Sequence, residues 1–194
     1  MSADTRPTLD LYLVRHGATE WSGNGRHTSR TDLPLLPEGR DAAARVGERL
    51  APLRFTAAFS SDMSRATETA ALAGFPDAQA TPLLREFDYG EYEGVTTEDI
   101  TRRRPGWSIY RDGCPGGETP AQVYARAQAF IRLLDGLGGD VVAFSHGHVL
   151  RALACAWTGL PITAGARFAL DTATISILRD GDRGRVVQEW NGRP

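Results

Sequence analysis

Two stretches of this 194-residue chain each place a histidine and then a glycine directly after an apolar run. The first run, residues 9–14, is followed by Arg15 and His16, and the second, residues 140–144, leads to His146. Short apolar runs of this kind are typical of buried strands. Ligands of open α/β sheets bind beyond the carboxyl ends of the strands, so we expect these groups to meet in one crevice.

A second arginine is expected at the same edge. Residues 55–59 are typical of a strand, and residues 60–62 supply candidate caps for the helix predicted over 63–73, whose first turn contains Arg65. The backbone N–H groups of a helix start favour an anion there. Two guanidinium groups can neutralise and orient phosphate oxygens, while the neutral imidazole of His16 attacks phosphorus in line and forms a covalent phosphoryl intermediate. The second imidazole, His146, would help to hold the equatorial oxygens.

A phosphoryl transfer of this type also needs a proton for the leaving alkoxide. Glu86 follows a predicted strand and is the best-placed acid in the order of the chain. The same carboxylate could take a proton from the water that hydrolyses the phosphohistidine. Burial would raise the pKa of Glu86 and the nearby arginines would lower it, and the sequence does not decide between the two effects.

The composition indicates one globular domain. Hydrophobic residues make up 41% and charged residues 24% of the chain, and the net charge is −2, with 22 arginines and no lysine. This balance gives no basic excess for nucleic acid or an anionic membrane, and no apolar run approaches the roughly 20 residues of a membrane helix. Residues 1–7 have no apolar signal core, which favours the cytoplasm. Cys114 and Cys155 are expected to be reduced thiols rather than a disulfide framework or a zinc site.

The patterning alternates strands with helices, which is typical of an α/β fold. Residues 18–32 have no sustained period and are interpreted as a loop that lines the crevice, and residues 91–118 as a flap over the site that contains a short helix at 97–103. Strands are expected at 9–14, 55–59, 78–82, 140–144, 167–170, 174–178 and 185–190, and longer helices at 37–50, 63–73, 119–134 and 147–157.

Four segments, taken in order, resemble the histidine phosphatase superfamily. They are residues 13–17, residues 61–70, Glu86 with the Tyr89-Gly90 and Glu93-Gly94 pairs, and Ser145-His146-Gly147. The resemblance covers nearly the whole chain and implies a phosphoglycerate-mutase-like fold, a three-layer α/β/α sandwich with a mostly parallel central sheet. It also implies that His16 is the phosphorylated nucleophile, that Arg15, Arg65 and His146 form the phosphate pocket, that Glu86 donates the proton, and that no metal or cofactor is used.

Substrate contacts are expected mainly from the first loop. The residues assigned to them are Thr19, Ser22, Arg26, His27, Thr28, Ser29, Tyr89 and Gly147. Ser22 stands where cofactor-dependent mutases of the family carry asparagine, and the flap is shorter than theirs. These departures favour a phosphatase acting on a small phosphorylated metabolite, in a monomer or a homodimer. The alternatives are a phosphoglycerate-type mutase and a non-catalytic module that binds a phosphorylated ligand.

Several other residues allow two interpretations. His148 could form a metal pair with His146, but no further ligands surround it in sequence, so a position at the pocket rim or helix start is preferred. The acids Asp88, Glu91 and Glu93 are interpreted as loop acids, with Glu93 bonded to backbone at a turn. The run at 102–104 is either a solvated helix face or a site for a second anionic group of the substrate. Trp107 and Tyr110 belong to the flap core or to the substrate wall.

Leu36 stands where a capping threonine is common in the family, so the helix at 37–50 should lack about 1 kcal/mol of cap stabilisation.

Overall fold

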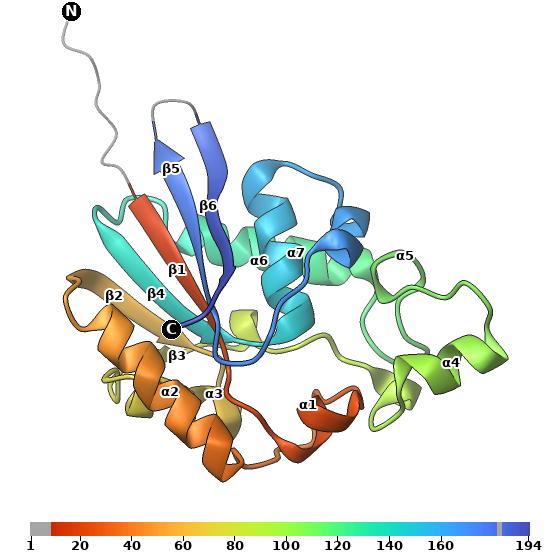
Figure 1. Cartoon of the computed structure of the whole chain (residues 1–194). Coiled ribbons are helices and arrows are strands. Elements are labelled where there is room, and N and C mark those ends of the chain that lie inside the picture. Colours follow the sequence, from red (N-terminus) through yellow and green to blue (C-terminus); the bar gives the residue numbers. More distant parts are fainter. Residues whose placement is uncertain (1–8, 182–183) are drawn as a thin grey trace, which may run out of the picture.

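One six-stranded sheet forms the centre of the molecule (Figure 1). The computed structural model describes residues 9–181 and 184–194. The strands lie in the order β3-β2-β4-β1-β5-β6, and β1 through β4 are parallel where they pair, whereas β5 and β6 run antiparallel. Their bounds are β1 (Leu9–Arg15), β2 (Phe55–Ser60), β3 (Gln79–Ala80), β4 (Asp140–Ser145), β5 (Ile175–Gly181) and β6 (Gly184–Gly192).

The register of β1 against β4 brings the two histidine segments to the same edge of the sheet. Val14 pairs with Phe144, and Arg15 pairs with Ser145. The amide of His16 then donates to the Ser145 carbonyl at 2.9 Å. The two strand ends therefore finish side by side, as the sequence predicted.

Helices cover both faces of the sheet, as Figure 1 shows. Alternate residues of β1 point to opposite faces. Leu11 and Leu13 pack in a cluster with α6 (Pro120–Leu133) and α7 (Gly147–Thr158). Tyr12 and Val14 pack in a second cluster with α2 (Pro37–Leu50) and α3 (Ser64–Leu72). This arrangement confirms the predicted three-layer α/β fold with a mostly parallel sheet.

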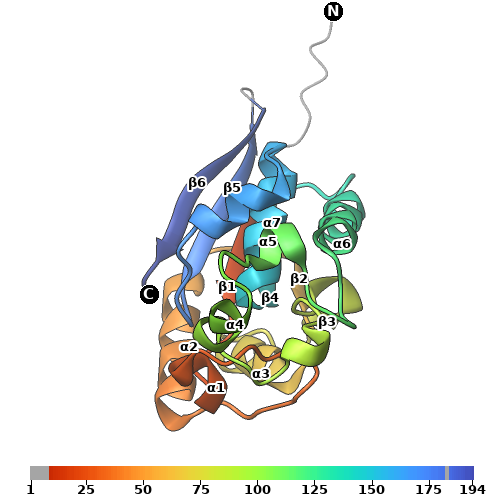
Figure 2. The same ribbon diagram turned by 90° about the vertical axis from the view of Figure 1, so that its right-hand side faces the viewer.

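Smaller elements build the two segments that flank the site. The first loop contains α1 (Glu20–Asn24), which the sequence did not predict; Thr19 and Ser22 close a capping box at its start. The flap contains α4 (Thr97–Arg103), as expected, and also α5 (Ile109–Asp112). Figure 2, which faces these elements, shows α1, α4 and α5 on the same side of the molecule. The short turns η1 (Pro82–Leu84), η2 (Gly90–Tyr92) and η3 (Ile162–Arg167) complete the described elements.

The flap has an apolar core of its own. Trp107 is 7% exposed and Tyr110 is 2% exposed, and both pack with Phe87 and Ile100 beneath α4 and α5. The tryptophan ring also lies 5.8 Å from the ring of His27. Both aromatic residues are therefore core residues of the flap, and Trp107 also borders the first loop.

One strand prediction is wrong. Residues 167–170 end η3 and continue as irregular chain up to β5. Two carbonyl groups of this segment accept side-chain donors rather than strand partners: Leu170 from Arg15 at 2.6 Å, and Ala169 from the indole of Trp190. The apolar pattern was correct about burial, since Leu170 is 4% exposed, but not about pairing.

Helix α2, at the end of the first loop, lacks a side-chain cap, as the sequence indicated. The cap of α3 differs from the prediction. Leu36 gives α2 no side-chain cap. The start of α3 was expected to be capped by residues 60–62, but Asp32 accepts from the amide and hydroxyl of Ser64 at 3.0 and 2.8 Å. The first loop therefore caps α3 from a distance, and this contact fixes the loop next to Arg65.

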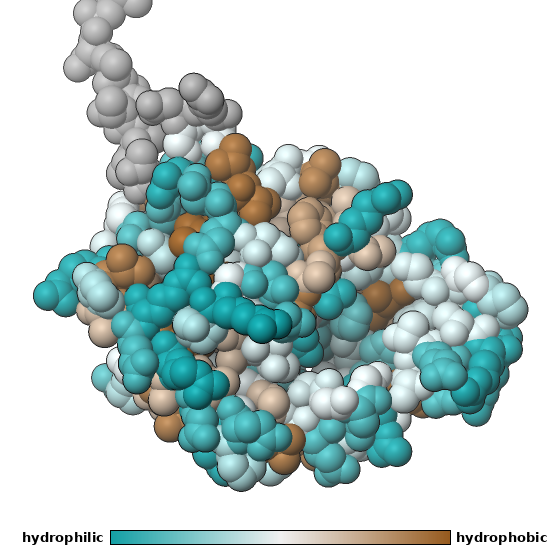
Figure 3. All heavy atoms as spheres, viewed as in Figure 1, coloured by the Kyte–Doolittle hydropathy of each residue, from teal (hydrophilic) through white to brown (hydrophobic). Residues whose placement is uncertain are grey.

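The run at 102–104 lies on an exposed part of the flap. Figure 3 shows hydrophilic residues over the outer surface of α4, where Arg102 pairs with Glu98 and Asp99. The run at 102–104 is thus a solvated helix face. None of the helices in the described residues is long and apolar enough to span a bilayer. The prediction about residues 1–7 lies outside the described residues.

Candidate active site

The two predicted imidazoles lie together where β1 and β4 end. The ring centroids of His16 and His146 are 5.1 Å apart, with an angle of 61° between the ring planes. Nδ1 of His16 lies 2.7 Å from the Gly17 carbonyl oxygen. A carbonyl only accepts, so Nδ1 carries the proton and Nε2 keeps its lone pair. The backbone of the turn that follows β1 thus selects the tautomer that a nucleophile needs.

The surroundings of His16 keep its ring neutral. The residue is 5% exposed. Burial, followed by the charges of Arg15 and Arg65, lowers the pKa of His16 to about 3. Both causes disfavour an imidazolium, and both guanidinium groups would attract a phosphate dianion to the same place.

Arg15 has a donor that no group in the described residues uses. One terminal nitrogen of its side chain donates to the Leu170 carbonyl, while the buried Nε has no partner. A Cβ placed on Gly147 would lie 3.3 Å from that Nε, so only glycine leaves this face of the guanidinium free. A buried unsatisfied donor is costly, and a bound anion would satisfy it.

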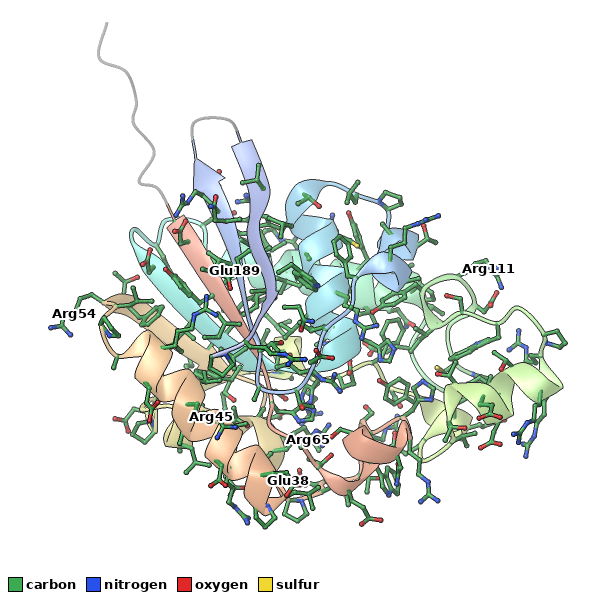
Figure 4. The ribbon with its side chains drawn as sticks, viewed as in Figure 1. Glu38, Arg45, Arg54, Arg65, Arg111 and Glu189 are labelled. Atoms are coloured by element: carbon green, nitrogen blue, oxygen red, sulfur yellow. The ribbon has the colours of Figure 1, made fainter. Side chains whose placement is uncertain are left out.

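Arg65 lies at the centre of the site and holds the first loop. Figure 4 shows it among the side chains between α3 and α1, whereas the exposed Arg54, which directly precedes β2, projects outward. Its terminal nitrogens donate to the carbonyls of Thr28, Ser29 and Thr31 at 3.1 to 3.2 Å. Arg65 is fully buried, so it adds positive charge to the pocket and fixes the loop at once.

His146 is bonded on both sides of its ring. Nδ1 accepts from Nε of Arg65 at 3.2 Å, so the ring proton lies on Nε2, which faces the hydroxyl of Ser61 at 2.8 Å. Burial and then the Arg65 charge hold the pKa of His146 well below its usual value. In this state His146 positions Arg65 and forms a neutral wall beside His16. Its contact with phosphate stays a prediction.

Glu86 is buried against the start of α7. One carboxylate oxygen accepts from the amides of Phe87 and Val149, each at 2.9 Å, and the other from the amide of His148 at 3.0 Å. Burial alone would raise the pKa of Glu86, but the hydrogen bond and charge of His148 outweigh it, and the pKa lies well below its usual value. The structure thus decides the balance that the sequence left open: in this state Glu86 is a carboxylate.

The hydroxyl groups of the first loop are largely used within the loop. The side chains of Thr19 and Ser22 form the capping box of α1, and the Thr28 hydroxyl donates to the Arg26 carbonyl at 3.2 Å. Arg26 is exposed, with its guanidinium 6.0 Å from the ring of Trp21. Their roles in substrate binding stay predictions.

Glu93 ties the flap to the first loop. Its carboxylate accepts from the amides of Ser29 and Thr31 at 2.9 to 3.1 Å, which confirms its expected role of bonding to backbone at a turn. The amide of Gly94 also donates to the carbonyl of His27. These bonds hold the carbonyls of the loop where Arg65 reaches them.

An aromatic and histidine wall continues from Glu86 towards the flap. The Tyr89 hydroxyl lies 2.7 Å from Nδ1 of His148, which is the second residue of α7, in agreement with the helix-start interpretation. The ring of His27 lies 4.7 Å from Tyr89 and 5.7 Å from His148. No cluster of histidine, cysteine and acid side chains in residues 9–181 and 184–194 has the arrangement of a metal site.

A groove of about 490 Å³ opens beside Glu86. Its lining includes Ser29, Glu86, Arg30, Arg85 and Arg126. Each of these arginines is paired with an acid, namely Asp88, Asp62 and Glu118. The arginines along the groove are therefore neutralised by acids.

Sequence reasoning missed three residues at the site. Ser61 bonds to His146, and Asp32 caps α3 and lies 3.8 Å from Arg65. Arg151 has a buried Nε without a partner, and its charge adds to burial in lowering the pKa of Arg15. Only Arg151 carried a signal, since it lies one helical turn after Gly147 and shares its face.

Comparisons with known proteins agree with this geometry. The histidine phosphatase superfamily (branch 1) matches residues 11–193. An acid phosphatase of Mycobacterium tuberculosis is 41% identical over 190 residues, covering 95% of this chain and 94% of its own length. A sedoheptulose 1,7-bisphosphatase of Saccharomyces cerevisiae is 38% identical over 183 residues, covering 77% of this chain and 68% of its own length. A solved structure of an open reading frame from Mycobacterium tuberculosis superposes with a TM-score of 0.91 at 39% identity, covering 95% of this chain and 97% of that one.

The fold and the site together define a phosphatase-type hydrolase with a histidine at the end of its first strand. The chain belongs to the histidine phosphatase superfamily, branch 1.

Proposed function

We propose that the protein hydrolyses small organic phosphomonoesters, such as sugar phosphates, through a phosphohistidine on His16. The observation that supports this most directly is the free Nε2 of a neutral His16 beside the guanidinium groups of the half-buried Arg15 and the fully buried Arg65. Relatives that act as an acid phosphatase and a sugar bisphosphatase give the same class of substrate.

The reaction has two steps. In the first, Nε2 of His16 attacks phosphorus, the ester bond breaks, and the leaving alkoxide takes a proton from Glu86. In the second, water attacks the phosphohistidine, Glu86 takes a proton from that water, and inorganic phosphate leaves. Arg15 and Arg65 offset the negative charge in both steps, and burial strengthens their effect.

Trapping the covalent intermediate tests the role of His16. After acid-free quenching of a reaction with labelled phosphomonoester, the wild type should carry label on His16, located by mass spectrometry. His16→Ala should carry none and should lose turnover to background. Arg45→Gln, on the exposed side of α2, is a matched control that should keep wild-type rates. Residual turnover in His16→Ala well above background would refute the nucleophile.

A mutase on the same residues would transfer the phosphoryl group back to its substrate. Incubation with 3-phosphoglycerate distinguishes the two reactions. We expect inorganic phosphate and glycerate, with no 2-phosphoglycerate beyond trace. Isomerisation faster than phosphate release would assign the protein to the mutases.

We propose that the reaction needs no divalent cation, because guanidinium groups supply the positive charge at the phosphate position. Dialysis against EDTA should leave kcat and KM unchanged within error. Loss of activity that a divalent ion restores would replace this mechanism with metal-assisted hydrolysis.

We also propose that the protein works in the cytoplasm. Cys114 and Cys155 are both buried and unpaired, which suits a reducing compartment. Fractionation of the source cells, with the protein detected by antibody, tests this location.

A further inference from the structure

His148 connects the buried Glu86 with solvent. Nδ1 of its ring lies 2.7 Å from the Tyr89 hydroxyl and 3.7 Å from one carboxylate oxygen of Glu86. The His148 side chain is 23% exposed, whereas that of Glu86 is 5% exposed. The imidazole of His148 therefore lies beside the Glu86 carboxylate and also reaches solvent.

The mechanism requires a proton on Glu86 that the surrounding backbone donors disfavour. Backbone N–H groups of Phe87, His148 and Val149 all point at the carboxylate and stabilise its charged form. When substrate binds, its phosphate dianion and the Glu86 carboxylate would repel each other in one buried site. Glu86 must therefore take up a proton. Some neighbouring group has to supply that proton when substrate binds.

Among the described side chains around Glu86, the imidazole of His148 is the best placed to exchange a proton with it. Tyr89 and Tyr110 face His148, and burial raises the pKa of both phenols, so they stay neutral. His27 also faces it, and burial lowers the pKa of His27 to about 4, so that ring is neutral too. In this cluster the ring of His148 is partly exposed and lies 3.7 Å from a carboxylate oxygen of Glu86, and an imidazole can both accept and release a proton.

We propose that His148 is the proton reservoir of Glu86, and that the Tyr89 hydroxyl holds its ring in the transfer position. This proposal rests on the phosphohistidine mechanism above. His148 gives Glu86 a backbone hydrogen bond and also places its ring near the carboxylate. The start of α7 therefore fixes the positions of both groups of His148 relative to Glu86. Because His148 acts through Glu86, it is a positioning and proton-supplying residue rather than a group that touches phosphorus.

The protons balance over one cycle. On substrate binding, Nδ1–H of the His148 imidazolium gives its proton to Glu86, and the ring becomes neutral. Glu86 then gives this proton to the leaving alkoxide, which departs as an alcohol. In the second step the attacking water gives a proton to Glu86, which returns it to Nδ1 of His148. No other acid is consumed.

The experiment compares two substrates whose leaving groups differ in their need for a proton. Glycerol 2-phosphate has a poor leaving group, whereas 2,4-dinitrophenyl phosphate leaves without protonation. We expect His148→Gln to lower kcat/KM for glycerol 2-phosphate by about 10²-fold and for the dinitrophenyl ester by less than about 3-fold. Tyr89→Phe should show the same selectivity with a smaller loss. Tyr124→Phe, which removes an exposed hydroxyl bonded to the Leu160 carbonyl, is the matched control and should match the wild type.

Coupling to Glu86 separates this proposal from a merely structural effect. In a Glu86→Gln background, adding His148→Gln should cause little further loss, because the reservoir has nothing left to supply. Added imidazole should restore His148→Ala on glycerol 2-phosphate towards wild-type rates. Circular dichroism and binding of inorganic phosphate establish that each variant is folded.

Equal losses on both substrates, additive losses in the double variant, or wild-type rates in His148→Gln would each overturn the proposal. A wild type that hydrolyses neither ester would instead overturn the proposed function.

Discussion

The chemistry of this site depends on the single atoms with which the side chains of His16 and Arg65 form hydrogen bonds. His16 is recognisable from its place after an apolar strand, but its reactive tautomer comes from one carbonyl, that of Gly17. Arg65 was expected to bind phosphate, and three loop carbonyls already engage it. Residue types and their order along the chain could be predicted, because they follow from strand ends. The partners of Arg65 could not, because they lie more than 30 residues away in sequence, and the bond of His16 to the neighbouring Gly17 depends on a turn geometry that the sequence pattern does not specify.

Glu86 could also be named from the sequence, whereas its hydrogen-bond partners could not. Its proposed role as proton donor can be tested by substitution. Glu86→Gln keeps the size of the side chain and removes its ability to donate or accept a proton. We expect kcat/KM for alkyl phosphates to fall by about 10² to 10⁴-fold, and for esters with acidic leaving groups to fall far less. A series of substituted phenyl phosphates measures this as a steeper dependence on leaving-group pKa. An unchanged slope would remove Glu86 as the acid.

Two glycines set how closely α2 approaches the turn after β1. A Cβ on Gly17 would lie 2.4 Å from the carbonyl oxygen of Gly39, and a Cβ on Gly39 would lie 2.4 Å from that of Ala18. Both contacts are with backbone, which cannot rotate away. This approach holds the peptide that follows His16, so packing between elements controls the position of the nucleophile.

Gly39→Ala should therefore damage both stability and activity. We expect the free energy of unfolding to fall by about 2–4 kcal/mol, as for other overpacked buried positions, and kcat to fall more than KM rises. Urea denaturation and steady-state kinetics measure the two effects. Gly23→Ala is the control, since α1 leaves open space there, and it should be neutral or slightly stabilising. Wild-type kcat in Gly39→Ala would show that the turn does not depend on this contact.

The elements that the sequence predicted well are those whose pattern arises locally. The four parallel strands and α2, α3, α6 and α7 were found within a few residues because periodic burial defines them. The first-loop helix α1 was missed because none of its residues is buried, so it shows no apolar period. The strand expected at 167–170 was wrong because side chains of Arg15 and Trp190 take its carbonyls.

At the scale of the whole molecule, the site concentrates titratable groups in a buried volume. His16, His27 and His146 are all buried, and burial is the first cause that lowers the pKa of each. The folded chain holds these rings neutral, whereas the unfolded chain would protonate them near pH 6.5. Holding these rings neutral at neutral pH is therefore linked to a lower free energy of unfolding in acid.

The sign of this linkage gives a prediction for the whole chain. Above pH 7 both states carry neutral histidines, so these groups contribute no pH dependence. Below about pH 6.5 the unfolded state binds more protons, so the free energy of unfolding should fall by about 4 kcal/mol between pH 7 and 5.5 if all three rings stay neutral when folded. Urea denaturation at both values measures the drop, and the window lies above the titration of the carboxylates. His16→Asn removes one of the three titrations, so its drop should be about one third smaller. An identical drop in wild type and variant would mean that His16 is protonated in the folded protein, and the neutral nucleophile would have to be abandoned.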